Sequence, residues 1–368
     1  MQTVLNKIAK ISALFTTLAS FPMAFASDLV TGAGSSFIAP VLYKWSANYN
    51  TEFGTKINYQ STGSGAGIKQ IEGNVVDFGA SDMPLKPTEL EAKGLFQFPA
   101  IIGGIVMVTN IPGVGQGQLI LDAKVIAEIY NGTIKFWNDP KILALNPNLT
   151  LPKKNILVVY RSDASGTTFN FTYFLDKAGM GAWKVGVGTA VSWPSGVMGV
   201  GGKGNEGITT MVKRAPGSIG YVEYAYAMQN KLSWARMINA DGKVVPSLTV
   251  KDFSDEKKVS EAFRKALQSA AINANWETAP GMNVILANQK GAETWPLTAS
   301  TFILIKKEQK NSKIGTEVLK FFDFAFKRGS ESAQALDYIP IPENTYRFIE
   351  KKWTHEIKSG NDKVAIWK

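Results

Sequence analysis

A unit of short strand, small polar turn and helix or loop recurs three times near the start of the chain, and it constrains the fold more than any other feature. The turns at 34–37, 63–65 and 81–82 each follow an apolar, strand-like stretch. The first two lead into segments whose apolar residues recur every three or four positions, which is the helical period. Such alternation is typical of a parallel sheet with helices on its faces. The sequence therefore predicts an α/β fold.

A fourth turn, at 161–167, is the best candidate for a binding site. It lies between a β-branched strand and a helix, at the carboxyl end of a strand, where open α/β sheets bind ligands. Arg161 offers a planar fork of donors that fits a tetrahedral oxyanion, and Asp163 can hold that fork in position. Ser165 and Thr167 add hydroxyl groups beside the free N–H groups of a helix start. The turn therefore suits an anion. The same residues also fit an alternative interpretation, an ordinary Ser/Gly turn with an Arg–Asp pair on the surface.

The composition excludes several kinds of site. The chain has 368 residues, enough for two domains, and it contains no cysteine, so disulfides, zinc–thiolate sites, iron–sulfur clusters and thiol nucleophiles are excluded. Its single histidine, His355, makes a His-based triad or a multi-histidine metal site implausible. The formal net charge is +10, but basic residues are scattered among acidic ones, so we expect no nucleic-acid partner.

The first 26 residues resemble an export signal rather than part of the fold. Lys7 and Lys10 precede a short apolar stretch at 11–21, and residues 24–26 match the small-x-small cleavage pattern. The apolar stretch is too short and too interrupted for a spanning helix. We therefore expect a cleaved signal peptide at 1–26 and export of the remaining chain.

Two extended apolar segments, at 96–109 and around 295–300, can carry the chain from one domain to another and back. They predict that domain I is discontinuous, formed by residues 27–102 and 297–368. The intervening residues, 103–296, then form domain II.

Taken together, the four turns and further motifs along the mature chain resemble the periplasmic phosphate-binding protein family of bacterial ABC phosphate-uptake transporters. The motifs lie at 31–34, 76–82, 94–99, 165–167, 201–205, 220–227 and 315–323. The resemblance implies a two-domain periplasmic-binding-protein-like fold of type II. In that fold each domain is a mainly parallel sheet flanked by helices, and a tetrahedral phosphate lies in the hinged cleft.

The resemblance also implies the ligand contacts. Asp82 should accept a hydrogen bond from the phosphate's own proton, and Asp163 should orient the arginine fork without touching phosphate. The chain departs from the family pattern just after Ser64, where Gly65-Ala66 replaces a more usual Ser-Gly. The implied phosphate-binding residues are Ser36, Phe37, Ser64, Asp82, Arg161, Ser165, Gly166 and Thr167.

The resemblance implies a monomeric binding protein that delivers phosphate to the permease and ATPase of an inner-membrane ABC transporter, with no cofactor, metal or catalysis. A phosphatase or phosphoryl-transfer enzyme is the first alternative, but it would need a nucleophile beside a base or a metal cluster, and the sequence offers neither. A surface adhesin with a secondary phosphate site is the second alternative, which the sequence leaves open.

Overall fold

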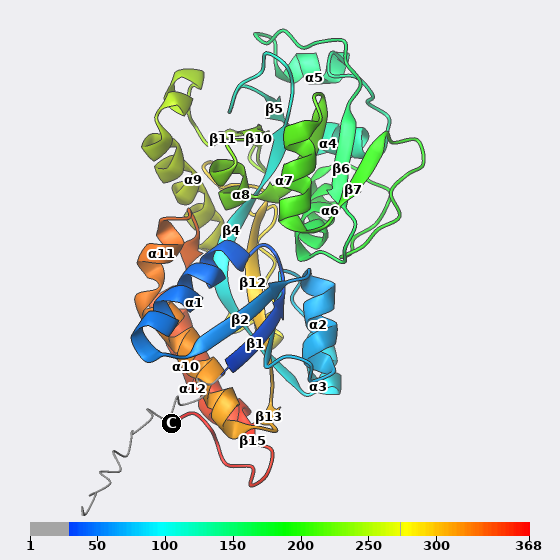
Figure 1. Cartoon of the computed structure of the whole chain (residues 1–368). Helices are drawn as coiled ribbons and strands as arrows, with labels where there is room; N and C mark the ends of the chain where they lie inside the picture. Colours follow the sequence, from blue (N-terminus) through cyan, green and yellow to red (C-terminus); the bar gives the residue numbers. More distant parts are fainter. Residues whose placement is uncertain (1–28, 273) are drawn as a thin grey trace, which may run out of the picture.

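The computed structural model describes residues 29–272 and 274–368 as a mixed α/β fold in which two groups of elements share one curled sheet (Figure 1). The outer strands pair in parallel, whereas the two long central strands pair antiparallel with their neighbours. The predicted α/β class is confirmed. The strand order is β2 (Lys56–Ser61), β1 (Leu29–Gly34), β3 (Phe78–Ser81), β12 (Thr298–Lys306), β4 (Leu95–Thr109), β8 (Ser218–Glu223), β6 (Leu157–Arg161) and β7 (Gly199–Gly202).

The first group of elements comprises β1, β2 and β3 with helices from both ends of the chain (Figure 1). In α10 the apolar residues Val318, Leu319 and Phe322 fall on one buried face. The helices of this group are α1 (Ala39–Phe53), α2 (Ser64–Glu72), α3 (Pro87–Lys93), α10 (Ser312–Arg328), α11 (Ser330–Gln334) and α12 (Glu343–Glu356).

Strand β4 connects the two groups, and all 15 of its residues are buried. Residues 95–104 pair with β12 and residues 105–109 pair with β8, so one strand belongs to both halves of the sheet. At the change of partner stands Gly104, where an added Cβ would lie 2.6 Å from Cζ of Phe263. The mostly apolar composition of β4 fits a strand whose two faces are both covered. The domain boundaries predicted from the sequence fall inside β4 and just before β12.

The second group comprises β6, β7 and β8 with the helices of the middle of the chain (Figure 1). Phe171 and Leu175 of α6 are fully buried, and the Phe171 ring stacks on Tyr221 of β8 at 4.3 Å between centroids. The helices of this group are α4 (Ala123–Tyr130), α5 (Pro140–Leu145), α6 (Gly166–Ala178), α7 (Gly204–Arg214), α8 (Tyr224–Gln229) and α9 (Glu256–Ala271).

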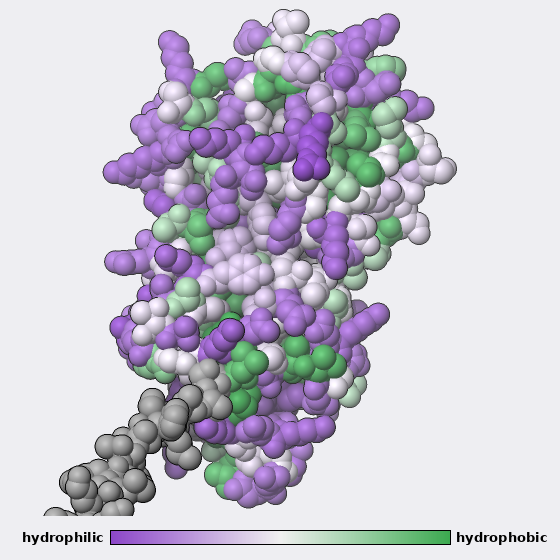
Figure 2. All heavy atoms as spheres, viewed as in Figure 1, coloured by the Kyte–Doolittle hydropathy of each residue, from purple (hydrophilic) through white to green (hydrophobic). Residues whose placement is uncertain are grey.

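The face of the molecule seen in Figure 2 is largely hydrophilic, with small, separate hydrophobic patches. None of the helices in residues 29–272 and 274–368 combines the length and the apolar composition needed to cross a membrane. The expected signal peptide, 1–26, lies outside the described residues. The short elements are β5 (Ile120–Leu121), β9 (Ser233–Trp234), β10 (Arg236–Ile238), β11 (Val244–Val245), β13 (Glu308–Gln309), β14 (Ile339–Pro340), β15 (Lys358–Ser359), η1 (Val250–Ser254) and η2 (Pro280–Met282).

Candidate anion-binding site

The four small-residue turns meet between the two groups of elements. They follow β1, β2, β3 and β6, and three of them lead into α1, α2 and α6. Because each follows a strand of a parallel set, all four lie at carboxyl ends of strands, where α/β sheets place their ligand sites. The structure brings the eight residues singled out from the sequence into this region. All eight are buried: Ser36, Phe37, Ser64, Asp82, Arg161, Ser165, Gly166 and Thr167.

Arg161 ends β6, and Asp163 holds its guanidinium as a fork. Nε donates to Oδ1 at 2.7 Å and Nη2 donates to Oδ2 at 2.5 Å, while Nη1 donates to Oγ1 of Thr167 at 3.3 Å. Burial acts to raise the pKa of Asp163, but the hydrogen bonds and charge of Arg161 and the Gly204 N–H outweigh it, so this pKa is lowered. These three bonds use three of the five N–H groups of the guanidinium, so one N–H on Nη1 and one on Nη2 remain as donors that Arg161 can offer to a ligand, in a fixed orientation.

Residues 165–167 form the first turn of α6 and supply donors from the second group of elements. The Ser165 hydroxyl caps the helix by accepting a backbone N–H at 3.1 Å, and the Gly166 N–H donates to Oγ of Ser64 at 3.0 Å. An added Cβ at Gly166 would lie 2.6 Å from that oxygen and 2.7 Å from Cβ of Asp82. Only glycine permits this close approach, which brings the positive end of the helix to the cluster.

Ser64 begins α2 and joins the second group to the first. Its Oγ accepts the Asp82 N–H at 3.3 Å as well as the Gly166 N–H. The neighbouring Gly65 N–H donates to the Ala164 carbonyl at 2.9 Å. The loop that departs from the family pattern after Ser64 therefore runs directly against the 161–167 turn, and Ser64 keeps its place in the cluster.

Asp82 is 2% exposed and its carboxylate is fixed by two hydroxyl groups. Ser35 and Thr301 donate to the same oxygen, Oδ1, at 2.6 and 2.7 Å. Burial raises the pKa of Asp82 to about 6, and these hydrogen bonds with the charge of Arg161 offset part of the rise. Because Oδ1 already accepts both hydroxyls, Oδ2 is the oxygen left to accept a proton from a ligand.

Ser36 and Phe37 lie in the turn between β1 and α1, and the structure pairs both with protein groups. Oγ of Ser36 accepts hydrogen bonds from the Asn205 backbone N–H at 3.0 Å and from its side-chain Nδ2 at 2.9 Å. The Phe37 N–H, expected to face the ligand, donates to Oγ of Ser35 at 2.9 Å. Ser36 is thus placed to donate to a ligand, whereas the Phe37 N–H already has an acceptor.

Sequence reasoning missed three residues that complete this cluster, namely Ser35, Thr301 and Asn205. Ser35 precedes Ser36 in the same turn, so its position next to a candidate was the available signal. Thr301 stands in β12 directly before the apolar run at 302–305, and a polar residue next to such a run is a signal visible in the sequence. Asn205 starts α7 within the 201–205 motif, and only the folded chain brings it to Ser36.

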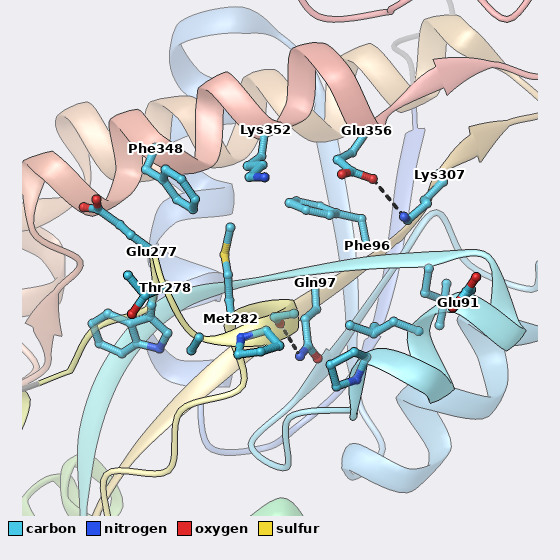
Figure 3. A pocket seen from close by; sticks show the side chains of 17 residues that line it. Glu91, Phe96, Gln97, Glu277, Thr278, Met282, Lys307, Phe348, Lys352 and Glu356 are labelled. Atoms are coloured by element: carbon cyan, nitrogen blue, oxygen red, sulfur yellow. Dashed lines mark hydrogen bonds and ion pairs between the residues drawn. The ribbon is translucent and has the colours of Figure 1, made fainter.

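A separate open cavity of about 460 Å³ lies between α3, β4, η2 and α12 (Figure 3). Three of its polar side chains are already engaged: Lys307 pairs with Glu356 at 2.8 Å, and Gln97 donates to the Gly281 carbonyl at 2.7 Å (Figure 3). The cavity shares no lining residue with the buried cluster. The candidate site is therefore the closed cluster, whose groups contact each other directly.

The raised pKa of Asp82 predicts that the ligand-free protein loses stability as the pH rises. Folding raises this pKa from 3.8 to about 6, so the folded state favours the protonated form. That contribution to the free energy of unfolding is complete below the unfolded-state pKa and is lost as the pH rises through the folded-state pKa. Two pKa units correspond to about 3 kcal/mol. Urea unfolding of phosphate-free protein measures the free energy of unfolding across this pH window. That free energy should fall with rising pH in the parent more than in D82N. The same pH dependence in both proteins would contradict this role of Asp82.

Comparisons with known proteins identify relatives over most of the chain. A family model described as a PBP superfamily domain matches residues 19–328. The phosphate-binding protein PstS of Haemophilus influenzae is 47% identical over 344 residues, which cover 93% of this chain and 97% of that protein. The phosphate-binding protein PstS of Pasteurella multocida is 46% identical over 357 residues, which cover 96% of this chain and 97% of that protein.

A solved structure shows the same fold at lower identity. The phosphate-binding protein of Stenotrophomonas maltophilia matches with a TM-score of 0.64 at 21% identity, covering 89% of this chain and 94% of that chain. This likeness confirms the predicted periplasmic-binding-protein-like fold. Because the family model spans most of the chain and the curated relatives match it over nearly their whole lengths, the chain belongs to the PBP superfamily and, within it, to the family of the phosphate-binding proteins PstS.

Proposed function

We propose that this chain binds inorganic phosphate in the buried cluster and delivers it to the permease and ATPase of an ABC importer. The observation that carries the proposal is the pairing of a donor fork, Arg161, with a buried acceptor, Asp82, in one cluster. A ligand that satisfies both must carry negative charge and also a proton to donate. Inorganic phosphate has both at neutral pH. The names of the curated relatives support the same ligand.

Local dipoles supply much of the charge compensation in the proposed site. Asp163 already balances the charge of Arg161, so the anion does not meet a free cation. The starts of α2 and α6 direct backbone N–H groups into the cluster, and buried hydroxyls add donors at Ser36, Ser64 and Thr167. A buried anion that is hydrogen-bonded on all sides avoids the large cost of leaving charge unsatisfied.

The proposed role is binding without catalysis. The buried hydroxyls of Ser36 and Ser64 accept from N–H groups, and neither donates to a general base among the described residues. His355, the single histidine, lies near the end of α12. Within 29–272 and 274–368, no three His, Asp or Glu side chains are grouped to hold a metal ion. The phosphate-binding names of the relatives favour this role over a phosphatase or an adhesin.

Calorimetric titration of ligand-stripped protein tests the proposed function. Phosphate and arsenate are both protonated tetrahedral anions and should bind, whereas sulfate is fully ionised and should give no measurable heat. Protein already saturated with phosphate provides the control and should give no further heat. Absence of phosphate binding would overturn the proposal. Steady release of product from a chromogenic phosphate ester, with or without divalent metal, would favour the phosphatase instead.

The proposal includes closure of two domains around the ligand, with domain I at 27–102 and 297–368 and domain II at 103–296. Hydrogen bonds between the two groups, such as Gly65 N–H to the Ala164 carbonyl, support a closed form. Since ligand contacts come from both sides, phosphate should favour closure. Small-angle scattering should therefore give a smaller radius of gyration with phosphate than without it. An unchanged profile at saturating phosphate would count against closure.

Export completes the proposal. Cleavage of residues 1–26 would release a monomeric chain into the periplasm, where it would collect phosphate for the importer. The basic start and the small-residue pattern at 24–26 support this placement.

A further inference from the structure

The Ser36 hydroxyl is surrounded by donors, and this restricts what its own proton can do. Ser36 is 1% exposed, and its Oγ accepts two hydrogen bonds from Asn205, one from the backbone N–H and one from Nδ2. A hydroxyl oxygen has two acceptor positions and one proton. Among the described residues, Oγ of Ser36 donates to no acceptor. The proton of the Ser36 hydroxyl therefore remains available for a hydrogen bond to a ligand in the cluster.

The orientation of the Asn205 amide is itself fixed. Asn205 is fully buried, and its Oδ1 accepts the backbone N–H of Glu223 at 3.0 Å. A flipped amide would lose that bond and would turn an oxygen toward Oγ of Ser36. The amide must therefore present its NH₂ group to Ser36, as a donor.

The start of α7 is anchored to the arginine fork as well. The Gly204 N–H donates to Oδ1 of Asp163 at 3.0 Å, and the same oxygen accepts Nε of Arg161. From α8, the Tyr226 hydroxyl donates to the Ser36 carbonyl at 2.7 Å. The turn that carries Ser36 is thus held by groups from the opposite side of the cluster.

We propose that Asn205 is a positioning residue that makes the Ser36 hydroxyl a dedicated donor to the bound phosphate. This inference rests on the proposed function and deepens it. Asn205 does not contact the ligand; it fills both acceptor positions of Ser36 and so leaves the proton for the anion. The alternative is a purely structural role, in which Asn205 only ties α7 to β8.

A double-mutant cycle separates the two roles. N205A should weaken phosphate binding about tenfold, the effect of one hydrogen bond to a charged network. The same change should cost less than about twofold when Ser36 is already alanine, because no hydroxyl remains to be oriented. S36T keeps a hydroxyl group at this position, so N205A should again weaken phosphate binding about tenfold when it is combined with S36T. Calorimetry with inorganic phosphate measures all of these variants.

A second substitution keeps the test informative if N205A does not fold. N205D retains an acceptor for the Glu223 N–H but offers Ser36 a carboxylate, which would capture the hydroxyl proton. N205D should lose more affinity for phosphate than N205A does. In the cycle with S36A, the loss that N205D causes should be at least about tenfold larger with Ser36 present than with alanine at position 36. The added charge acts in both backgrounds and cancels. Asn148 is exposed, so N148D is the matched control and should bind like the parent.

The outcomes distinguish this inference from the proposed function. A parent protein that does not bind phosphate overturns both. A parent that binds phosphate, with Asn205 variants equally weakened in the Ser36 and S36A backgrounds, overturns only the inference and leaves Asn205 a structural residue.

Discussion

The substitution D82N is expected to reduce the preference for phosphate over sulfate by at least about a hundredfold. In the parent, sulfate has no proton for Oδ2 of Asp82 and faces a buried carboxylate with like charge. Discrimination by an unmatched buried polar group can reach about four to five orders of magnitude. An asparagine can turn its NH₂ group toward the ligand, so sulfate gains a donor while phosphate loses the acceptor of its proton.

Competition titrations of phosphate and sulfate on parent and D82N measure this ratio. Arsenate should follow phosphate in both proteins, because it carries the same kind of proton. D77N is a matched control, since Asp77 accepts hydrogen bonds from Thr31 outside the cluster and its loss should leave the ratio unchanged. Tight sulfate binding by the parent, or the same ratio in D82N, would remove Asp82 from this role.

Replacing Arg161 by alanine is expected to cost about 4 kcal/mol of phosphate binding, roughly a thousandfold in affinity. The substitution removes the forked donors and also leaves the Asp163 carboxylate without its main partner, facing an anion. R161K should recover only part of the loss, since an ammonium group cannot bind Asp163 and phosphate as a planar fork. Calorimetry gives the affinities, and thermal unfolding shows whether each variant folds.

Loss of the buried ion pair can destabilise R161A itself, so the double variant R161A/D163A is measured beside it. It removes the stranded carboxylate and should still bind phosphate far more weakly than the parent. R347A is the matched surface control: Arg347 pairs with Glu343 at 2.6 Å, but both side chains are more than half exposed. Parent-like affinity in both Arg161 variants would make the 161–167 turn a structural feature only.

Local patterns in the sequence were sufficient for most individual elements. The apolar β-branched run before Arg161 forms β6, and the helix predicted after it forms α6, because strand and helix periods reflect burial of neighbours a few residues apart. The long apolar segment at 96–109 is one strand for the same reason, since every residue in it is covered. The eight candidate site residues also converge, because each stands at or shortly after the carboxyl end of a strand in a parallel set. Their contact with phosphate stays a prediction.

The partners that tune these residues were decided only by the tertiary structure. Thr301 reaches Asp82 across 219 positions of sequence, because the antiparallel register that sets Phe302 opposite Ser81 brings the preceding residue of β12 beside Asp82. Asn205 reaches Ser36 across 169 positions, through the packing of α7 against the opposite turn. The sequence by itself determined which segments form strands, helices and polar turns, since those depend on near neighbours. Register and the packing of distant elements depend on the whole chain at once, and no local period records them.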